Sequence, residues 1–150
     1  MSHKPESAFA DDRITSFGLF VEANRRVMRT IEASLQDEHG LALVEFEALI
    51  RLARAEEGHM SMSQLAQQMV LTSGGATRLV DRLVGDGLVE REACPSDRRV
   101  LWAKLSSAGR SKLEAALTTH LQDLDTNYFA PMSAKDRSTL DSVFDRLRTC

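Results

Sequence analysis

The sequence predicts a mainly α, α+β domain, in which a long N-terminal helix and two C-terminal helices flank a smaller unit that carries one β-hairpin. Apolar residues recur at spacings of three and four along several separate stretches, which is the pattern of amphipathic helices. Two segments, 88–93 and 100–105, alternate instead and enclose the turn residues Pro95, Ser96 and Asp97, which is the pattern of a hairpin. The length of 150 residues, with 43% hydrophobic and 27% charged side chains, suits a single domain with a sizeable core.

Helices precede the hairpin over about 12–38, 43–55, a short stretch from Ser61, and 73–86. The first is supported by an apolar stripe and by a stop signal at His39-Gly40, although Asn24 interrupts the stripe. The third starts at Ser61, because Gln64 follows it at the spacing of a capping box. Thr72 or Ser73 can cap the fourth.

Helices return after the hairpin over about 107–128 and 134–148, with Pro131 between them. The order is therefore helix, helix, short helix, turn, helix, hairpin, helix, helix. No internal repeat or low-complexity segment is visible.

The charge balance argues against a protein that coats nucleic acid indiscriminately, because the net charge is −3. Residues 72–104 are nevertheless slightly basic, with six basic and five acidic side chains. No apolar run approaches a membrane span and the start shows no signal-peptide pattern, so we expect a cytoplasmic protein without membrane contact. Two cysteines and four scattered histidines indicate neither a disulfide framework nor a metal site, and no cofactor is expected.

Two short helices joined by a tight turn and followed at once by a hairpin match a winged helix-turn-helix. The second helix of such a motif lies in the DNA major groove, with its N-terminal residues facing the base edges. Here that helix begins with "TSGGATR", and Arg78 and Arg82 share one helix face. The glycine pair, Gly74 and Gly75, costs helix stability but allows the backbone amides to approach a phosphate closely. Double-stranded DNA is therefore the expected partner.

The hairpin tip supplies a second set of basic side chains. Arg98 and Arg99 lie where a wing would enter the minor groove, whose negative potential favours arginine. Asp97 would be repelled by phosphate unless it pairs within the protein, so we expect it to brace Arg99 or a neighbouring arginine. The alternative for Arg78 and Arg82 is an exposed helix face on which they pair with Asp81 and Asp86.

The chain resembles the MarR family of transcriptional regulators over essentially its whole length. The resemblance is carried by "MSMSQLAQQMVLTSGGATRLVDRLVGDGLVEREACPSDRRVLWAKLSSAGR", with its "RLVDRL" and "GLVER" runs, its "DRR" wing and its "L-S-x-x-G-R" entry to the next helix. It implies a single domain over 1–150, in which 12–38 and 106–150 form dimerisation helices. The winged helix-turn-helix DNA-binding lobe would be 43–105, with a recognition helix at about 73–86 and a wing at about 88–105.

The resemblance also implies a homodimer on a pseudo-palindromic operator, most often a repressor relieved by a small phenolic or lipophilic effector. The family's DNA-contacting positions fall on Thr72, Ser73, Gly74, Gly75, Thr77, Arg78, Arg82, Arg98 and Arg99, with Asp97 as the brace of the wing. Gly74 departs from the polar or basic side chain that relatives often carry there, which leaves base reading to Thr77, the arginines and the wing.

Two further sets of residues are weaker candidates. Phe17, Phe20, Met28, Phe46 and Trp102 are candidates for an effector pocket, although apolar residues at helical spacing more often belong to a core. Cys94 is a candidate redox thiol, because Arg91, Arg98 and Arg99 lie near it in sequence, although a small half-buried strand residue is the commoner case. Cys150 is expected to be exposed and incidental.

The sequence thus favours a DNA-binding transcriptional regulator. A winged-helix module that binds protein instead of specific DNA is the alternative. An enzyme is not expected, because no nucleophilic, metal or phosphate-binding constellation occurs at useful spacing.

Overall fold

The computed structural model describes residues 10–149 and divides the chain into two compact units. Unit 1 comprises Met1–Ala33 and Asp123–Cys150, and unit 2 comprises Ser34–Gln122. The first helix, α1 (Asp12–His39), and the fifth, α5 (Ser107–Leu124), each contribute residues to both units. Cys150 lies outside the described residues. The predicted mainly helical class with one small sheet is confirmed.

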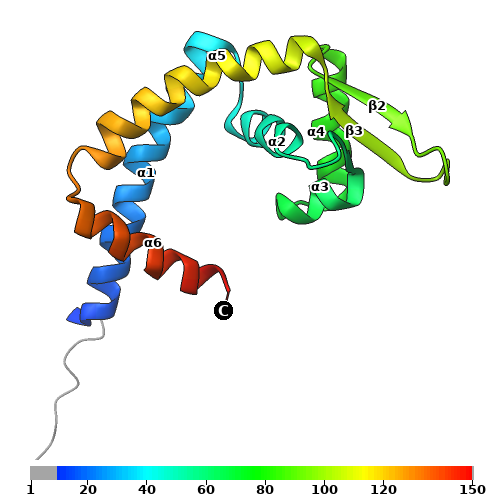
Figure 1. The fold of residues 1–150 in the computed structure, drawn as a ribbon. Helices are drawn as coiled ribbons and strands as arrows, with labels where there is room; N and C mark the ends of the chain where they lie inside the picture. Colours follow the sequence, from blue (N-terminus) through cyan, green and yellow to red (C-terminus); the bar gives the residue numbers. More distant parts are fainter. Residues whose placement is uncertain (1–9, 150) are drawn as a thin grey trace, which may run out of the picture. The chain divides into compact units, whose positions relative to one another are not determined.

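Unit 2 is built around three helices, α2 (Leu43–Ala53), α3 (Met62–Gln68) and α4 (Ser73–Gly85), as Figure 1 shows. The end of α1 joins them, and a hydrogen bond of 2.8 Å between His39 Nε2 and Thr119 Oγ1 links it to α5. The largest fully buried side chains of the described residues all belong to this unit: Phe46, Leu35, Leu41, Leu49, Leu52, Leu65, Leu83 and Val80. Unit 2 therefore has a closed hydrophobic core of its own.

A three-stranded antiparallel sheet completes unit 2. The predicted hairpin forms β2 (Val89–Ala93) and β3 (Leu101–Leu105), with Arg91 opposite Ala103. A two-residue strand, β1 (Met60–Ser61), pairs with the other edge of β3, so the strand order is β1-β3-β2. The sequence did not predict β1, because two residues are too few to show an alternating pattern.

The ends of α3 and α4 follow their capping residues. Ser61 Oγ accepts a hydrogen bond from the Gln64 amide, and Gln64 Oε1 accepts one from the Ser61 amide, so the predicted capping box is confirmed. Gly87 has a φ of 72° and turns the chain from α4 into β2. Val70 has a φ of 54° at the turn between α3 and α4 and is 92% exposed. A β-branched residue in this left-handed conformation is strained.

The entry to α5 packs directly against the start of the wing. The backbone amide of Ser106 donates to the Leu88 carbonyl at 3.0 Å, and Ser106 Oγ donates to the Gly87 carbonyl at 2.7 Å. Gly109 lies so close that a Cβ added to it would be 2.0 Å from the Leu88 carbonyl oxygen. Only glycine fits at this position, which explains the glycine of the "L-S-x-x-G-R" stretch.

Unit 1 contains the N-terminal part of α1, a π-helix η2 (Asp125–Phe129) and α6 (Ala134–Arg148). The predicted helix over 107–128 thus ends as an α-helix at Leu124 and continues with π-helical hydrogen bonding to Phe129. Ser133 and Asp136 form a capping box at the start of α6. Phe20 approaches Phe144 of α6, with ring centroids 6.4 Å apart.

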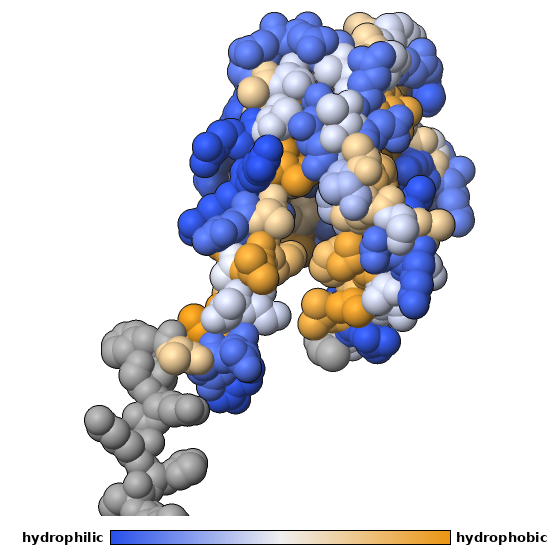
Figure 2. Space-filling view, turned by 90° about the vertical axis from the view of Figure 1, so that its left-hand side faces the viewer, coloured by the Kyte–Doolittle hydropathy of each residue, from blue (hydrophilic) through white to orange (hydrophobic). Residues whose placement is uncertain are grey.

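The apolar side chains of unit 1 are largely exposed. Phe17 is 66% exposed and Phe20 is 50% exposed, and no described residue of α6 is buried. Figure 2 shows orange, apolar side chains exposed on the face that it presents. Unit 1 therefore has much less of a closed core than unit 2. No helix in the described part of the chain is long and apolar enough to cross a membrane.

Candidate nucleic-acid interface

The N-terminus of α4 presents an exposed group of short side chains and backbone amides. Thr72 caps the helix, because its Oγ1 accepts a hydrogen bond from the Gly75 amide at 3.1 Å. The first two amides of the helix, those of Ser73 and Gly74, have no partner within the helix geometry. Ser73, Gly74 and Thr77 are all exposed. The helix end can therefore direct donors and a partial positive charge at an anion.

The two glycines at this end have different surroundings. A Cβ added to Gly75 would lie 3.1 Å from Thr72 Oγ1, so the small residue there leaves room for the cap. A Cβ added to Gly74 would meet only Arg78 Nη1, at 3.6 Å, which is ordinary van der Waals distance. The guanidinium of Arg78 thus lies beside Gly74, close to the free amides of the first turn.

The two arginines of α4 differ in what they bind within the protein. Arg78 is exposed, and among the described residues it has no ion pair. Arg82 Nη1 donates to Oε1 of the buried Glu45 at 3.1 Å, and Glu45 Oε2 accepts from the Ala42 amide at 2.9 Å. Arg82 therefore ties α4 to the start of α2. The alternative partner considered from sequence, Asp86, does not pair with it.

A second link joins α4 to the wing. Arg91 of β2 forms an ion pair with Asp81 and donates from Nη2 to the Thr77 carbonyl at 3.3 Å. Glu45 and Arg91, which position α4, were not predicted from the sequence. Both pairs join residues on different elements, and spacing along one helix gives no signal of that kind.

The wing loop between β2 and β3 carries one held arginine and one free arginine. Asp97 Oδ1 accepts hydrogen bonds from the Arg99 amide and from Arg99 Nε, both at 3.1 Å. These hydrogen bonds lower the pKa of Asp97 from its ordinary value and keep the carboxylate charged. Arg98 is exposed and has no ion pair among the described residues.

Cys94 is buried at the base of the wing loop. Its Sγ lies 3.1 Å from Ser96 Oγ, and this hydrogen bond is the main cause that lowers the pKa of the thiol, followed by the backbone amide of Asp97. The sequence pointed to neighbouring arginines as the cause, and that attribution is wrong. Cys94 as a whole is only 8% exposed, which is less access to solvent than a reactive thiol usually has.

The five effector-pocket candidates are divided between the units. Phe17, Phe20 and Met28 belong to unit 1, while Phe46 and Trp102 belong to unit 2. Phe46 is 1% exposed and lies against the ring of His120, and Trp102 stacks on His59 with ring centroids 3.9 Å apart. Within the described residues, no group of His, Cys, Asp and Glu is arranged to hold a metal ion.

Residues 39–100, which contain the helix-turn-helix and most of the wing, match the model of the MarR family. A solved structure described as a probable transcriptional regulator from Pseudomonas aeruginosa is 31% identical, covers 86% of this chain and 93% of its own, and superposes with a TM-score of 0.72. The chain belongs to the MarR family.

This MarR-family chain is also similar to two further proteins. It is 33% identical over 88 residues to the HTH-type transcriptional regulator MhqR of Bacillus subtilis (strain 168), a match that covers 59% of each chain. Sco3205 from Streptomyces coelicolor, a MarR family transcriptional regulator solved in complex with DNA, is 23% identical with a TM-score of 0.87. That alignment covers 91% of this chain and 86% of Sco3205, and it establishes the shared fold.

Proposed function

We propose that this protein is a homodimeric transcriptional regulator that binds a pseudo-palindromic operator in double-stranded DNA in the cytoplasm. The observation that carries the proposal is the exposed start of α4, where free amides and the unpaired Arg78 lie together beside Gly74. A helix of this kind reads the major groove with its N-terminal residues. Sco3205, which has the same fold, has been solved in complex with DNA.

The proposed contacts fall into two groups. Thr72, Ser73, Gly74, Gly75, Thr77 and Arg78 would meet the major groove and its phosphates, and Arg98 and Arg99 would meet the minor groove. Arg82 belongs to the first group only if its guanidinium serves Glu45 and a phosphate together. Asp97 holds Arg99 in the turn between β2 and β3, which reduces the rotamer entropy that Arg99 loses on binding.

The homodimer is supported by the exposed apolar surface of unit 1. Exposed aromatic and aliphatic side chains on one unit of a soluble chain mark an interface. The large apolar side chains of unit 1 that are exposed to solvent are Ile14, Phe17, Leu19, Phe20, Phe144 and Leu147. A second copy of the same surface would cover them, and a two-fold axis would present two recognition helices about one helical turn, ~34 Å, apart.

The resemblance to MarR regulators supports two finer proposals. The protein would repress its target genes, and a small phenolic or lipophilic compound would relieve that repression by favouring a dimer with wrongly spaced recognition helices. A reporter gene behind the operator, measured with and without such compounds, tests both points.

The central test measures binding to DNA from the region upstream of the protein's own gene by fluorescence anisotropy at several salt concentrations. We expect nanomolar-range binding that weakens steeply with salt. Arg78→Ala should weaken binding by about tenfold or more and reduce the salt slope by about one if the contact is to phosphate. Arg110→Ala, an exposed arginine on α5, is the matched control and should bind as the wild type does.

One outcome would overturn the proposed function, and another would overturn only the assignment of Arg78. Weak, sequence-independent binding together with a co-purifying protein would favour a winged-helix interaction module. Unchanged operator affinity in Arg78→Ala, in a protein that otherwise binds specifically, would remove the residue assignment but leave the regulator.

A further inference from the structure

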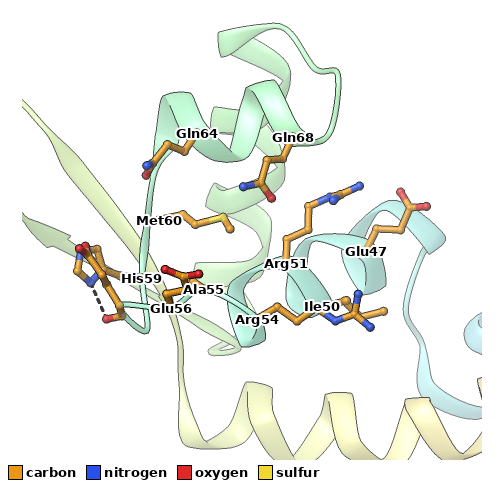
Figure 3. A pocket seen from close by; sticks show the side chains of 11 residues that line it. Glu47, Ile50, Arg51, Arg54, Ala55, Glu56, His59, Met60, Gln64 and Gln68 are labelled. Atoms are coloured by element: carbon orange, nitrogen blue, oxygen red, sulfur yellow. Dashed lines mark hydrogen bonds and ion pairs between the residues drawn. The ribbon is translucent and has the colours of Figure 1, made fainter. Parts of the chain in front are cut away.

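A polar cavity of about 600 Å³ lies in unit 2, between the second half of α2, the loop that follows it, and α3 (Figure 3). None of the residues proposed above to contact DNA lines it. The volume is within the range of small-molecule sites. The side chains that line the cavity are mostly charged or amide side chains, so its ligand should be polar.

One side of the cavity carries two arginines. Arg51 lies in the last turn of α2 and Arg54 is the C-cap residue of that helix, and neither has an ion pair among the described residues. The Nε of Arg51 is buried and has no hydrogen-bond partner in the described chain. Glu47 stands four residues before Arg51, the usual spacing of a helix pair, yet the two are not within ion-pair distance. Buried unpaired donors are costly, so an anionic group is expected here.

Figure 3 shows the amide of Gln68 beside the aliphatic part of the Arg51 side chain, with Gln64 one turn earlier on the same helix. An amide can donate to the second oxygen of a carboxylate that a guanidinium holds. Arg51 of α2 and Gln68 of α3 therefore both supply hydrogen-bond donors for a carboxylate at one end of the cavity.

The opposite side is acidic. Figure 3 places Glu56 and His59 across the cavity from Arg51 and Arg54. Glu57 also lines the cavity and pairs with His59 Nε2 at 3.4 Å, and the stacking of His59 on Trp102 fixes that ring. Glu56 has no partner among the described residues. A lone anion would be repelled by these carboxylates, whereas a cationic group would pair with Glu56.

One apolar side chain, that of Met60, lies between the two charged sides. Figure 3 shows Met60 in the middle of the cavity, and Ile50 of α2 also lines it. Met60 is 8% exposed. Its thioether adapts well to methylene groups.

We propose that this cavity binds a small ω-amino acid, a zwitterion whose carboxylate and ammonium groups are separated by a short alkyl chain. The carboxylate binds Arg51 and Arg54 with help from Gln68, the methylenes lie on Met60, and the ammonium pairs with Glu56. The site is independent of the proposed DNA contacts and does not depend on them for its test.

The probe is 6-aminohexanoate, titrated into the full chain in the absence of DNA and followed by calorimetry and by the backbone amide shifts of residues 50–68. We expect saturable binding in the micromolar-to-millimolar range. Hexanoate lacks the ammonium and hexylamine lacks the carboxylate, so each should bind about tenfold more weakly, the effect of one charge-assisted hydrogen bond.

Matched variants locate the site. Arg51→Gln and Glu56→Gln should each weaken 6-aminohexanoate binding by about tenfold, whereas Arg110→Gln and Glu114→Gln, outside the cavity, should not change it. In Arg51→Gln, 6-aminohexanoate should no longer bind more tightly than hexylamine, but it should still bind more tightly than hexanoate. In Glu56→Gln, 6-aminohexanoate should no longer bind more tightly than hexanoate, but it should still bind more tightly than hexylamine. Gln68→Ala, which removes no charge, keeps the test usable if an arginine variant unfolds.

Three results would overturn the proposal: no saturable binding, equal binding of hexanoate, or wild-type binding by both Arg51→Gln and Glu56→Gln. Each can be obtained whether or not the protein binds DNA.

Discussion

Unit 2 and unit 1 use their apolar side chains in opposite ways. In unit 2, Phe46, Leu49 and Val80 are fully buried, and helices and sheet close around them. In unit 1, Phe17 and Phe20 are at least half exposed, and the described part of α6 has no buried residue. A unit that buries its core is stable through its own packing, whereas one that exposes aromatic rings gains stability when another surface covers them. This difference predicts for which substitutions the loss of stability depends on protein concentration.

The largest expected change in stability is the loss caused by replacing a buried phenylalanine of unit 2, which we compare with an exposed phenylalanine of unit 1. Phe46→Ala should lower the free energy of unfolding by about 3–5 kcal/mol, because it leaves a cavity in a closed core. The loss should be the same at every protein concentration. Phe20→Ala should act mainly on assembly, so its midpoint of unfolding should fall with dilution more steeply than that of the wild type. Denaturation at several concentrations and sedimentation equilibrium measure both. An equal, concentration-independent loss in the two variants would contradict the comparison.

The next largest change in stability is expected when two glycines, one in each unit, are replaced by alanine. Gly109→Ala should cost about 3 kcal/mol, because the new Cβ meets a backbone carbonyl that cannot move without displacing the wing. Gly18 in α1 has open space around it, so Gly18→Ala should raise helix stability by up to about 1 kcal/mol. Thermal unfolding of both variants under identical conditions is the measurement. A stable Gly109→Ala protein would show that α5 and the wing are packed less closely than described.

A smaller effect is expected at the turn between α3 and α4. Val70→Gly should stabilise unit 2 by about 0.5–1 kcal/mol, since glycine relieves the positive φ and the exposed side chain makes little packing contribution. The control is Val84→Gly, which places glycine inside α4 and should destabilise by about 1 kcal/mol. Chemical denaturation resolves the two signs, and a loss of stability in Val70→Gly would mean that the valine side chain has a contact that offsets the strain.

The smallest effect concerns pH and the wing. Because Arg99 lowers the pKa of Asp97, their pairing contributes stability above the pKa of the unfolded chain and loses it as the pH falls through the lower, folded pKa. Carbon-detected NMR titration of the Asp97 carboxyl should show this pKa rising in Arg99→Ala and staying unchanged in Arg98→Ala. An unchanged value in Arg99→Ala would mean that the brace does not form in solution.

Local sequence patterns predicted most of the elements, because helix periodicity and caps act over a few residues. The capping box at Ser61 and the hairpin around Pro95 depend on neighbours along the chain, and both are present. The strand β1 and the π-helical segment Asp125–Phe129 depend on tertiary pairing or on a shift in hydrogen bonding, for which the sequence has no local signal.

The site was predictable only in part for the same reason. The positions of Arg78 and Arg98 on exposed elements follow from the helix and hairpin. The partner of Arg82 does not, since Glu45 is 37 residues away, and Arg91 reaches Asp81 across 10 residues from strand to helix. Charge pairing between elements requires their packing to be known. Which residues contact DNA stays a prediction.

The junction between the wing and α5 has a consequence for local motion. The amides of Ser106 and Gly109 are held by the Leu88 carbonyl and by Ser106 Oγ, at 3.0 Å and 2.9 Å. Both amides should therefore exchange with solvent deuterium only when this whole corner opens, whereas amides at the wing tip around Ser96 should exchange rapidly. The wing would then bend at its tip while its base stays fixed to α5, so that the loop adjusts to the width of a groove without a change in the angle at which the hairpin leaves the core.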